Sequence, residues 1–432
     1  MTPEFQIVFV FAVFLLLLAA GMAVPFAIAV PAILYLLLQG GVVALKGLGL
    51  VSWGSMDSFT LTAIPLFILM AEILQASGLS ARIYRGLAKL VAAVPGGLLQ
   101  TNIAGCAVFA AISGSSVATA ASIGGVALPQ LVGRNYDRPL AAGSLAAGGT
   151  LGILFPPSLA MIIYGAFTET SVAKLFMAGV IPGLMLTGMF MSYIAVHALM
   201  KPGAAPREHG PGSLAGVLFA LGEVLPFLFL IAGTLGLIYL GLVTPTEAAA
   251  VGCICAIAIS WIWGDFSWRV FMLAMRRTVR LLGNLLFIVY AAYVFSYAIS
   301  FAGIGEELTG FLVGLKLNQV EFFLALFVLY TVLGCLVESV GMIVITVPLL
   351  FPVLGGYGID PVWFGVLLVL FIELGQISPP IGINLFVIQS IWNGKLSEVV
   401  LGTIPFHLIM VVLLILLMLF PPLCLWLPAH MS

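Results

Sequence analysis

Apolar segments of about 20 residues recur from one end of the chain to the other, and this is the length of helix that crosses a bilayer. Hydrophobic residues make up 63% of the chain and charged residues 7%, whereas a soluble domain carries about 25% charged residues. The pattern predicts an all-α polytopic membrane protein with no soluble domain between its spans. No basic residue precedes the apolar stretch 5–20, which continues past Gly21, so a cleavable signal peptide is not expected.

The residues that could carry chemistry form no enzymatic, metal or cofactor pattern in the sequence. The five cysteines all lie inside apolar runs, and the spacing of Cys253 and Cys255 is too close for a usual metal site. The sequence contains no nucleophile elbow, phosphate loop or zinc helix. A formal net charge of -1 gives no reason to expect a nucleic-acid partner. We therefore expect neither an enzyme nor a bound cofactor.

The two halves of the chain repeat each other. "SGSSVATAASIGGVALP" and "LGILFPPSL" in the first half correspond to "VESVGMIVITVPLLFP" and "LGQISPPIGIN" in the second. One constant spacing aligns Ser116 with Ser339, Gly152 with Gly375, and the pair Pro156–Pro157 with Pro379–Pro380. Repeats of this kind in transporters frame a binding site near the middle of the membrane. We expect a first repeat over residues 1–205 and a second over 206–432.

The repeats are expected to be inverted because matching segments differ in charge. Lys and Arg residues in short loops stay in the cytoplasm, which places most of the 15 basic residues on one side. The basic segment 82–89 matches a stretch around 304–316 that carries two glutamates and one lysine. The basic amphipathic arm 266–282 matches the nearly uncharged stretch 42–56. Matching segments then lie on opposite sides of the membrane, and both termini lie outside.

Each repeat is predicted to contain a re-entrant helical hairpin whose tip lies at membrane depth. The hairpins cover residues 98–131 and 321–352, and each leg of about 15 residues is short for a full span of roughly 20. The first tip holds a cluster of Gly and Ser residues that ends at Ser116, and the second tip holds Glu338, Ser339 and Gly341. Such backbone is tolerated only where it is buried in protein or lines an aqueous cavity.

A transmembrane helix broken at a pair of prolines follows each hairpin. The broken helices are expected over 139–167, interrupted at Pro156–Pro157, and over 362–391, interrupted at Pro379–Pro380. The freed carbonyls and nearby hydroxyls suit an alkali cation, and the positive ends of half-helices suit an anionic group. The alternative is that the prolines make simple kinks and that the small residues only let helices pack closely. The nearby polar residues are Thr150, Ser158, Gln376, Ser378 and Asn384.

Five glutamates lie inside apolar segments, where an ionisable group is a functional candidate by default. Glu338, at the second hairpin tip, is the one expected to act in transport. Glu223 and Glu373 are expected near an interface in a structural role, and Glu247 at a helix start, where a carboxylate favours the helix dipole. Glu72 stays open. No arginine is expected inside a span, so recognition of an anion would use polar side chains and backbone.

At the hairpin and the proline pairs, the sequence resembles the large membrane subunit of a tripartite ATP-independent periplasmic (TRAP) transporter. The runs "GSSVATAASIGGVALP", "GTLGILFPPS" and "ISPPIGIN" carry the resemblance, which extends over essentially the whole chain. It implies sodium-driven uptake of a small organic anion, a carboxylate or sugar acid, through an elevator motion in the bacterial inner membrane. It also implies two partners, a small four-helix membrane subunit and a periplasmic substrate-binding protein. Because the chain opens with "MTPEFQIVF", the small subunit is expected as a separate chain.

The resemblance also assigns roles to individual residues. It implies two sodium regions, formed by Ser115, Ser116, Thr150 and Gly152 and by Ser339, Gly341, Gly375 and Ser378. It implies a substrate site between the hairpin tips at Ser116, Pro156, Pro157, Glu338, Pro379, Pro380 and Asn384. The alternative functions are a stand-alone divalent-anion/sodium symporter that takes its substrate directly from solution, and a channel.

Overall fold

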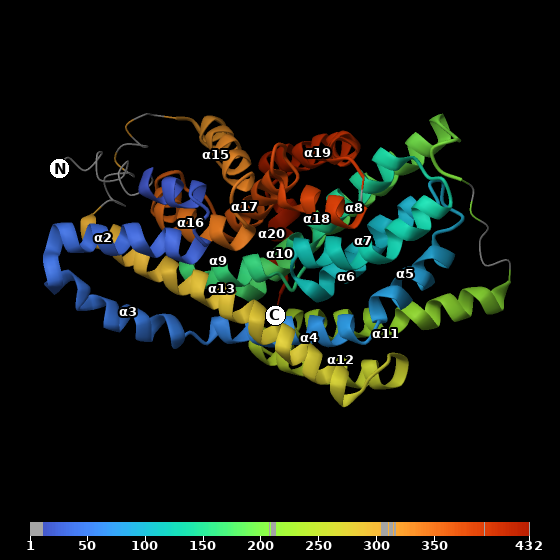
Figure 1. Cartoon of the computed structure of the whole chain (residues 1–432), viewed down its shortest axis with the longest axis horizontal. Helices are drawn as coiled ribbons and strands as arrows, with labels where there is room; N and C mark the ends of the chain where they lie inside the picture. The colour runs from blue at the N-terminus through green and yellow to red at the C-terminus, as the bar shows by residue number, and fades with distance from the viewer. Residues whose placement is uncertain are drawn as a thin grey trace.

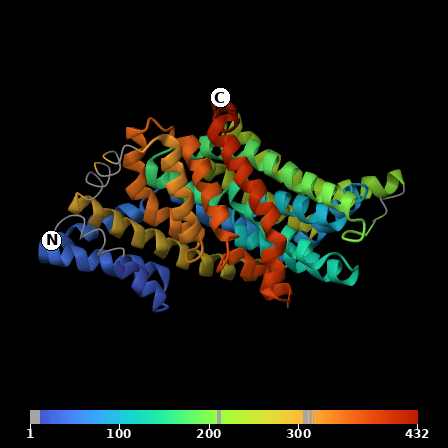
Figure 2. The same cartoon turned by 90° about the horizontal axis from the view of Figure 1, so that it is seen from above.

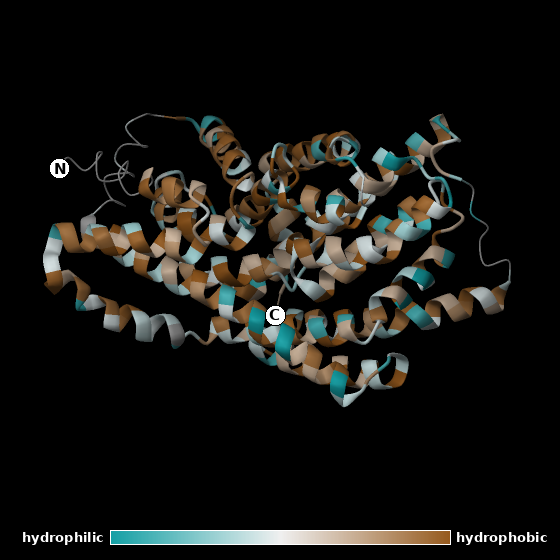
Figure 3. Cartoon of the chain, in the orientation of Figure 1, coloured by the Kyte–Doolittle hydropathy of each residue, from teal (hydrophilic) through white to brown (hydrophobic). Residues whose placement is uncertain are grey.

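The chain forms an elongated assembly of helices (Figure 1). The computed structural model describes residues 12–206, 208, 213–303, 310, 314, 317–392 and 394–431. Every regular element in these ranges is a helix, and nine of these helices are long and apolar enough to cross a membrane. Most of the ribbon in Figure 3 is accordingly hydrophobic. The predicted all-α polytopic membrane protein is therefore confirmed.

The first half of the chain contains one short hairpin and one interrupted helix (Figure 1). In chain order they are α2 (Val24–Leu45), α3 (Gly47–Met56), the 3-10 turn η1 (Thr60–Thr62), α4 (Ala63–Ala76), α5 (Leu79–Leu90), α6 (Leu98–Ser113), α7 (Ser116–Gly133), α8 (Arg138–Leu154), α9 (Leu159–Thr168) and α10 (Val172–Met200).

The second half has the same order of hairpin and interrupted helix. Its elements are α11 (Leu214–Tyr239), α12 (Pro245–Trp263), α13 (Trp268–Ala302), α15 (Gln319–Gly334), α16 (Ser339–Gly356), α17 (Pro361–Gln376), α18 (Ile383–Trp392), α19 (Leu396–Leu419) and α20 (Pro422–Ala429). The inverted orientation of the two repeats stays a prediction.

The first hairpin, α6 and α7, turns at a glycine and a serine. Gly114 ends α6 with a φ of 63°, a left-handed conformation that glycine adopts without steric cost. Ser115 is extended and caps α7 by accepting a hydrogen bond from the Ala118 amide at 3.4 Å. The two legs have 16 and 18 residues. A tight connection between them follows from these two residue types.

The helix after each hairpin is interrupted at its proline pair. Between α8 and α9, Phe155 is extended and the Pro156–Pro157 bond is cis, and Ser158 then caps α9. Between α17 and α18, the Pro379–Pro380 bond is also cis. Proline lacks the amide that continues a helix, and it disfavours the helical conformation of the residue before it. Both interruptions therefore arise locally.

The sequence suggested that the basic stretch 266–282 is an element of its own, but the structure joins it to the span that follows. It forms the first half of α13, a single helix of 35 residues that is capped by Ser267 and ends at Gly303 with a φ of 69°. α13 contacts α2, α3, α4 and α16 and runs obliquely across the molecule in Figure 1. Its arginines thus continue directly into an apolar span. Most of the stretch 304–316, which was predicted to match the basic segment 82–89, lies outside the described residues.

The two halves pack into one core rather than side by side. α8 contacts α19, and α7 contacts α18, so elements of the second half lie against the first hairpin (Figures 1 and 2). Small residues allow this approach, since a Cβ atom on Gly143 would lie 2.1 Å from the Gly402 backbone. A Cβ atom on Gly402 would lie 1.7 Å from the Pro139 carbonyl oxygen. Close backbone packing therefore joins α8 of the first half to α19 of the second.

Candidate functional site

The tip of the first hairpin lies against the first interruption. The Leu159 amide donates a hydrogen bond to the Gly114 carbonyl oxygen at 3.2 Å. A Cβ atom on Gly114 would lie 2.5 Å from the Pro157 carbonyl oxygen, and one on Gly152 would lie 2.4 Å from the Ser115 carbonyl oxygen. A side chain at either position would displace neighbouring backbone, so glycine allows the close approach. The predicted residues Ser115 and Gly152 are thus in direct contact.

Hydroxyl groups surround the carbonyl of this tip. Ser113 Oγ lies 2.7 Å from Thr119 Oγ1 and donates to the Ser115 carbonyl oxygen at 3.3 Å. Thr119 is fully buried and was missed by the sequence analysis, although it lies one helical turn after Ser115 in the same motif. The Thr150 hydroxyl does not contact this tip. It donates to the Ala147 carbonyl oxygen at 2.7 Å and lies 4.0 Å from Met410 Sδ on α19.

The first tip also contacts the second interruption, across the two halves of the chain. Ser116 Oγ donates to Gln376 Oε1 at 2.5 Å and lies 3.5 Å from Asn384 Oδ1. The residues Ser116, Gln376 and Asn384 are buried, with exposed fractions of 2%, 0% and 0%. Neither Gln376 Nε2 nor Asn384 Nδ2 has a hydrogen-bond partner in the described part of the chain. Such groups cost free energy when left unpaired, which makes this contact a candidate binding point.

Glu373 lies one turn before Gln376 on α17, and its position differs from the expectation. It is completely buried, so it does not extend its carboxylate toward water. Both carboxylate oxygens lack a hydrogen-bond partner among the described residues. A buried carboxylate without a partner is a functional candidate in a membrane protein. The sequence indicated this candidate only through its position on α17, the helix that precedes Pro379–Pro380.

The second hairpin tip meets the second interruption through small residues. A Cβ atom on Gly375 would lie 2.5 Å from the Tyr330 carbonyl oxygen and 2.9 Å from the Gly334 backbone. Cys335 Sγ lies 3.6 Å from the carbonyl oxygen of Ser378 and 3.6 Å from that of Pro379. The predicted residues Gly375 and Ser378 therefore lie where α15 ends against the break.

The remaining residues of the second tip face different neighbours. Glu338 precedes the first residue of α16 and makes no side-chain capping bond, and Ser339 is buried. A Cβ atom on Gly341 would lie 2.5 Å from Val337 Cγ1 and 3.4 Å from Val24 Cγ1 of α2. Glu338 is half-buried and faces a cavity, whereas Gly341 provides room for α2. The second tip is therefore less polar than the first.

One cavity of 460 Å³ joins both hairpin tips to α4 and α13. Ser113, Ser115 and Glu338 line it from the tips, and Glu72, Gln75 and Asn284 line it from the two long helices. Its size lies in the range of small-molecule sites. The cavity thus places polar groups of both halves around a space large enough for a small organic molecule.

Contacts at the edge of this cavity join α4 to its neighbours. Gln75 Nε2 donates to Ser122 Oγ of α7 at 2.6 Å. Arg277 of α13 lies 3.9 Å from Glu72 Oε2. Arg277 lies in the basic first half of α13, which continues into a candidate span. The expectation that no arginine lies inside a span stays a prediction.

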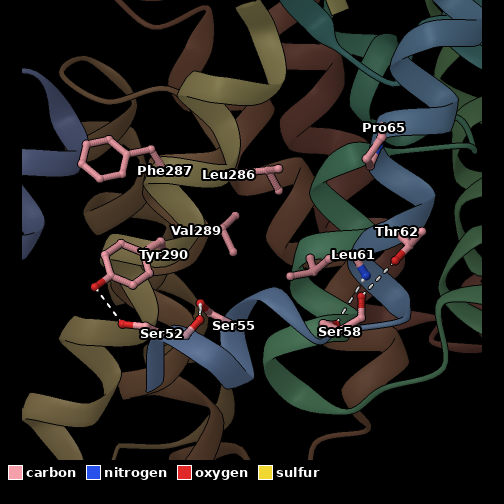
Figure 4. Close-up of a pocket in the computed structure, with 10 residues that line it drawn as sticks. All are labelled: Ser52, Ser55, Ser58, Leu61, Thr62, Pro65, Leu286, Phe287, Val289 and Tyr290. Carbon is pink, nitrogen blue, oxygen red and sulfur yellow. Dashed lines mark hydrogen bonds between the residues drawn. The ribbon is translucent and has the colours of Figure 1, made fainter. Parts of the chain in front are cut away.

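A larger cavity of 630 Å³ lies between α3, η1 and α4 on one side and α13 on the other (Figure 4). Hydroxyl groups line it, and Ser52 Oγ lies 3.0 Å from the Tyr290 hydroxyl. Its lining residues are Ser52, Ser55, Ser58, Leu61, Thr62, Pro65, Leu286, Phe287, Val289 and Tyr290, none of which is charged. It contacts neither hairpin tip nor either proline pair, so we place the candidate site in the smaller cavity.

Two other glutamates have the structural roles expected of them. Glu247 N-caps α12 together with Thr244, whose amide donates to the Glu247 carboxylate at 2.8 Å in a capping box. Glu223 lies 3.5 Å from Arg82 and 3.8 Å from Arg85, which neutralise its buried carboxylate. The predicted place of Glu247 at a helix start is confirmed, whereas the place of Glu223 near a membrane interface stays a prediction.

Comparison with known proteins identifies the family. Residues 11–423 match the family model described as "Tripartite ATP-independent periplasmic transporter, DctM component". The C4-dicarboxylate TRAP transporter large permease protein DctM of Pseudomonas aeruginosa is 33% identical over 89% of this chain and 90% of its own length. The sialic acid TRAP transporter large permease protein SiaM of Vibrio cholerae is 30% identical over 95% of this chain and 96% of its own length.

Other similar proteins differ in length or share only the fold. The isethionate TRAP transporter permease protein DctMQ of Oleidesulfovibrio alaskensis is 30% identical over 94% of this chain and 64% of its own length. Among solved structures, the YdaH transporter of Alcanivorax borkumensis has a TM-score of 0.66 at 16% identity, with 90% of each chain covered. MtrF of Neisseria gonorrhoeae has a TM-score of 0.57 at 14% identity, with 90% of this chain and 85% of that one covered.

The family match and the permease relatives extend over nearly the whole chain, including both hairpins and both proline pairs. The chain is a transporter permease and not an enzyme, and it belongs to the DctM component family of the tripartite ATP-independent periplasmic transporters.

Proposed function

We propose that this chain is the large membrane subunit of a sodium-driven secondary transporter that imports a small organic anion. The observation that carries the proposal is the contact of Ser116, at the first hairpin tip, with Gln376 and Asn384 at the second interruption. It joins polar groups of both halves in one buried region next to a cavity of 460 Å³. Interrupted segments at matching positions of two repeats are typical of transporter binding sites.

The first sodium ion is proposed to bind at the first hairpin tip. The Ser115 carbonyl and the hydroxyls of Ser113 and Thr119 are hard oxygen ligands, which suit an alkali cation. Gly152 brings the α8 backbone within contact of the same carbonyl. Ser116 remains a candidate ligand, whereas the Thr150 hydroxyl faces α19 and would have to turn.

A second sodium ion is proposed at the second tip. The proposal rests on Ser339 at the start of α16, on Gly341, and on the contact of Gly375 and Ser378 with the end of α15. Bound cations would organise carbonyls that the interruption leaves unpaired. They would also offset the charge of an anionic substrate.

The substrate is proposed to be a carboxylate or a sugar acid that binds between the tips. Ser116 and Asn384 offer polar side chains, and the two half-helices after Pro156–Pro157 and Pro379–Pro380 direct their positive ends toward the interruptions. Arg277, beside Glu72, adds a cation near the cavity. Glu338 lines the same cavity and would disfavour a second negative charge while it is ionised. This arrangement favours an anion that binds together with sodium.

Transport is proposed to follow an elevator motion, in which α6–α9 and α15–α18 move as one body against the remaining helices. The hydrogen bond from Gln75 on α4 to Ser122 on α7 joins the two bodies in this conformation. A reducible bifunctional thiol reagent that joins Gln75→Cys to Ser122→Cys should therefore abolish uptake, and reduction should restore it. The two single cysteine variants are the matched controls. Uptake by the cross-linked protein at the rate of its reduced form would exclude the motion.

The proposed partners are a small four-helix membrane subunit and a periplasmic substrate-binding protein. Two relatives are named as C4-dicarboxylate and sialic acid permeases, so these acids form the first substrate panel. We propose the bacterial inner membrane as the location, with a periplasmic N-terminus. Cysteines substituted at these positions, in Arg134→Cys and Asp360→Cys, would then react with a membrane-impermeant thiol reagent from opposite sides.

The decisive experiment measures uptake into proteoliposomes that contain this chain and its small subunit. Labelled acid and binding protein are added with an inward sodium gradient, and with potassium in place of sodium. We expect uptake only when sodium and the binding protein are both present. Uptake without sodium would refute sodium coupling. Sodium-dependent uptake that needs no binding protein would favour the stand-alone symporter, and single-channel currents would indicate a channel.

A further inference from the structure

A basic cavity of 580 Å³ lies between α5, α11 and the adjoining ends of α6 and α7, away from the transport site. Its charged lining residues are Arg82, Arg85, Lys89, Arg134, Glu208 and Glu223. We define these six residues as the basic cavity. None of them contributes to the hairpin tips or to the proline interruptions.

The positive charges in the basic cavity exceed the negative ones. A single carboxylate, that of Glu223, is shared by Arg82 at 3.5 Å and Arg85 at 3.8 Å. Lys89 places its ammonium 4.4 Å above the Phe219 ring. Arg134 is paired with Glu208 at 2.7 Å. The four cations and two carboxylates therefore leave a formal excess of two positive charges, which favours an anionic ligand.

The cavity lies at the level where a bilayer meets water. Arg82 donates a hydrogen bond to the Trp263 carbonyl oxygen at the end of α12. Trp261, Trp263 and Trp268 are exposed by 76%, 40% and 71% at this end of the helices. Tryptophan gathers at the interfacial level of membrane proteins, and long basic side chains extend toward it from helix ends. The basic groups thus lie at headgroup depth.

An exposed apolar stripe on α11 begins at the cavity and runs along the helix. Leu218, Phe219, Leu225 and Phe229 are exposed by 60%, 57%, 47% and 70%, and their spacing places them on neighbouring positions of the helix surface. At 1.5 Å per residue, the stripe is about 16 Å long, which is close to half of the roughly 30 Å hydrocarbon core. It therefore matches the length of one leaflet.

We propose that the basic cavity binds the headgroup of an anionic phospholipid, whose acyl chains lie along the α11 stripe. The excess positive charge attracts the phosphate groups, and the apolar α11 stripe contacts the acyl chains. A headgroup with two phosphates matches the excess of two charges best. Basic pockets between helices on the cytoplasmic side are suited to such headgroups. A soluble anion would use the cavity but not the stripe.

The test uses the complex of this chain and its small subunit, reconstituted in nanodiscs that contain cardiolipin, phosphatidylglycerol or only phosphatidylcholine. Lipid that remains bound after extraction is measured by native mass spectrometry. The variant Arg85→Gln/Lys89→Gln removes two cations and leaves Arg82 to pair with Glu223. Lys174→Gln, at an exposed position on α10, is the matched control. Lys89→Gln alone serves if the double variant does not fold, because the Lys89 ammonium lies over an aromatic ring.

We expect the wild type and Lys174→Gln to retain cardiolipin, and the cavity variant to retain at least tenfold less. Inorganic phosphate at millimolar concentration should not displace the lipid. Equal retention by the cavity variant would overturn the proposal. Displacement by phosphate alone would indicate a soluble anion site. If the cavity variant loses the small subunit but retains the lipid, the cavity is a protein interface. This result and displacement by phosphate would each overturn the lipid proposal.

Discussion

Replacing Gly152 by alanine tests the proposed first sodium site most directly. The added Cβ atom would lie 2.4 Å from the Ser115 carbonyl oxygen and 2.7 Å from Thr119 Oγ1. Ordinary contact begins at 3.4 Å, so α8 and the hairpin tip must separate by about 1 Å. Because the nearest atoms are backbone, no flexible side chain can absorb the change. The carbonyl proposed to bind sodium therefore moves.

The expected magnitude follows from the packing. Overfilling a packed site costs about 1–3 kcal/mol, of which the helix preference of alanine over glycine returns roughly 0.5–1 kcal/mol. Global stability should thus fall by no more than about 2.5 kcal/mol. A loss of about 1.4 kcal/mol in sodium binding is a factor of ten in affinity. We expect the sodium concentration for half-maximal uptake to rise about tenfold in Gly152→Ala.

The assay is the sodium dependence of uptake in proteoliposomes, with the thermal midpoint in detergent as a check on folding. Gly125→Ala on α7 is the matched control, because a Cβ atom there would meet nothing within 4 Å. The control should keep the sodium dependence of the wild type. A folded Gly152→Ala protein with unchanged sodium dependence would refute the assignment of this carbonyl to sodium binding.

Three further substitutions test the packing and the loops. Ser116→Ala leaves the buried Gln376 oxygen without its donor and should lower stability by about 1–3 kcal/mol in a denaturation series, whereas Ser192→Ala, whose hydroxyl bonds to its own helix, should not. Burial raises the pKa of Tyr136 to about 12, while an unfolded tyrosine ionises near 10, so the thermal midpoint should fall as the pH rises from 10 to 12. The thermal midpoint of Tyr136→Phe should fall less than that of the wild type over this pH range. An equal fall in both proteins would contradict the assignment of the pH dependence to Tyr136. Thr244→Ala removes the capping box of α12 and should cost about 1 kcal/mol, measured by amide exchange at the start of that helix.

The local features of the fold were predictable because short-range chemistry produces them. The hairpin predicted over 98–131 is formed by α6 and α7, whose turn depends on Gly114 and Ser115. The interruptions predicted at Pro156–Pro157 and Pro379–Pro380 occur there, since two consecutive prolines remove the amides that would continue the helix. Single prolines such as Pro182 and Pro226 are instead accommodated inside helices. The continuous helix α13 was not predicted because its basic first half and apolar second half differ in composition but not in helix propensity.

The side-chain partners at the site could not be predicted, because they come from distant parts of the chain. Ser116 meets Gln376, the last residue of α17, only because α17 lies against α8 and α18 against α7. Glu373 looked like an interfacial residue by its position in the sequence, yet the helices around α17 bury it completely. Thr150 carries the right chemistry at the right distance along the chain, but the helix directs its hydroxyl toward Met410.

The sequence by itself determined that this protein is a bundle of membrane helices with two hairpins and two proline interruptions, and that it belongs to the TRAP permease family. Hydrophobic length, proline and glycine act within a few residues, so their effects can be read along the chain. Only the tertiary structure decided that Ser115, Glu338, Glu72 and Asn284 share one cavity. Which side chains meet depends on how helices far apart in sequence pack and rotate against one another, and no local pattern contains that information.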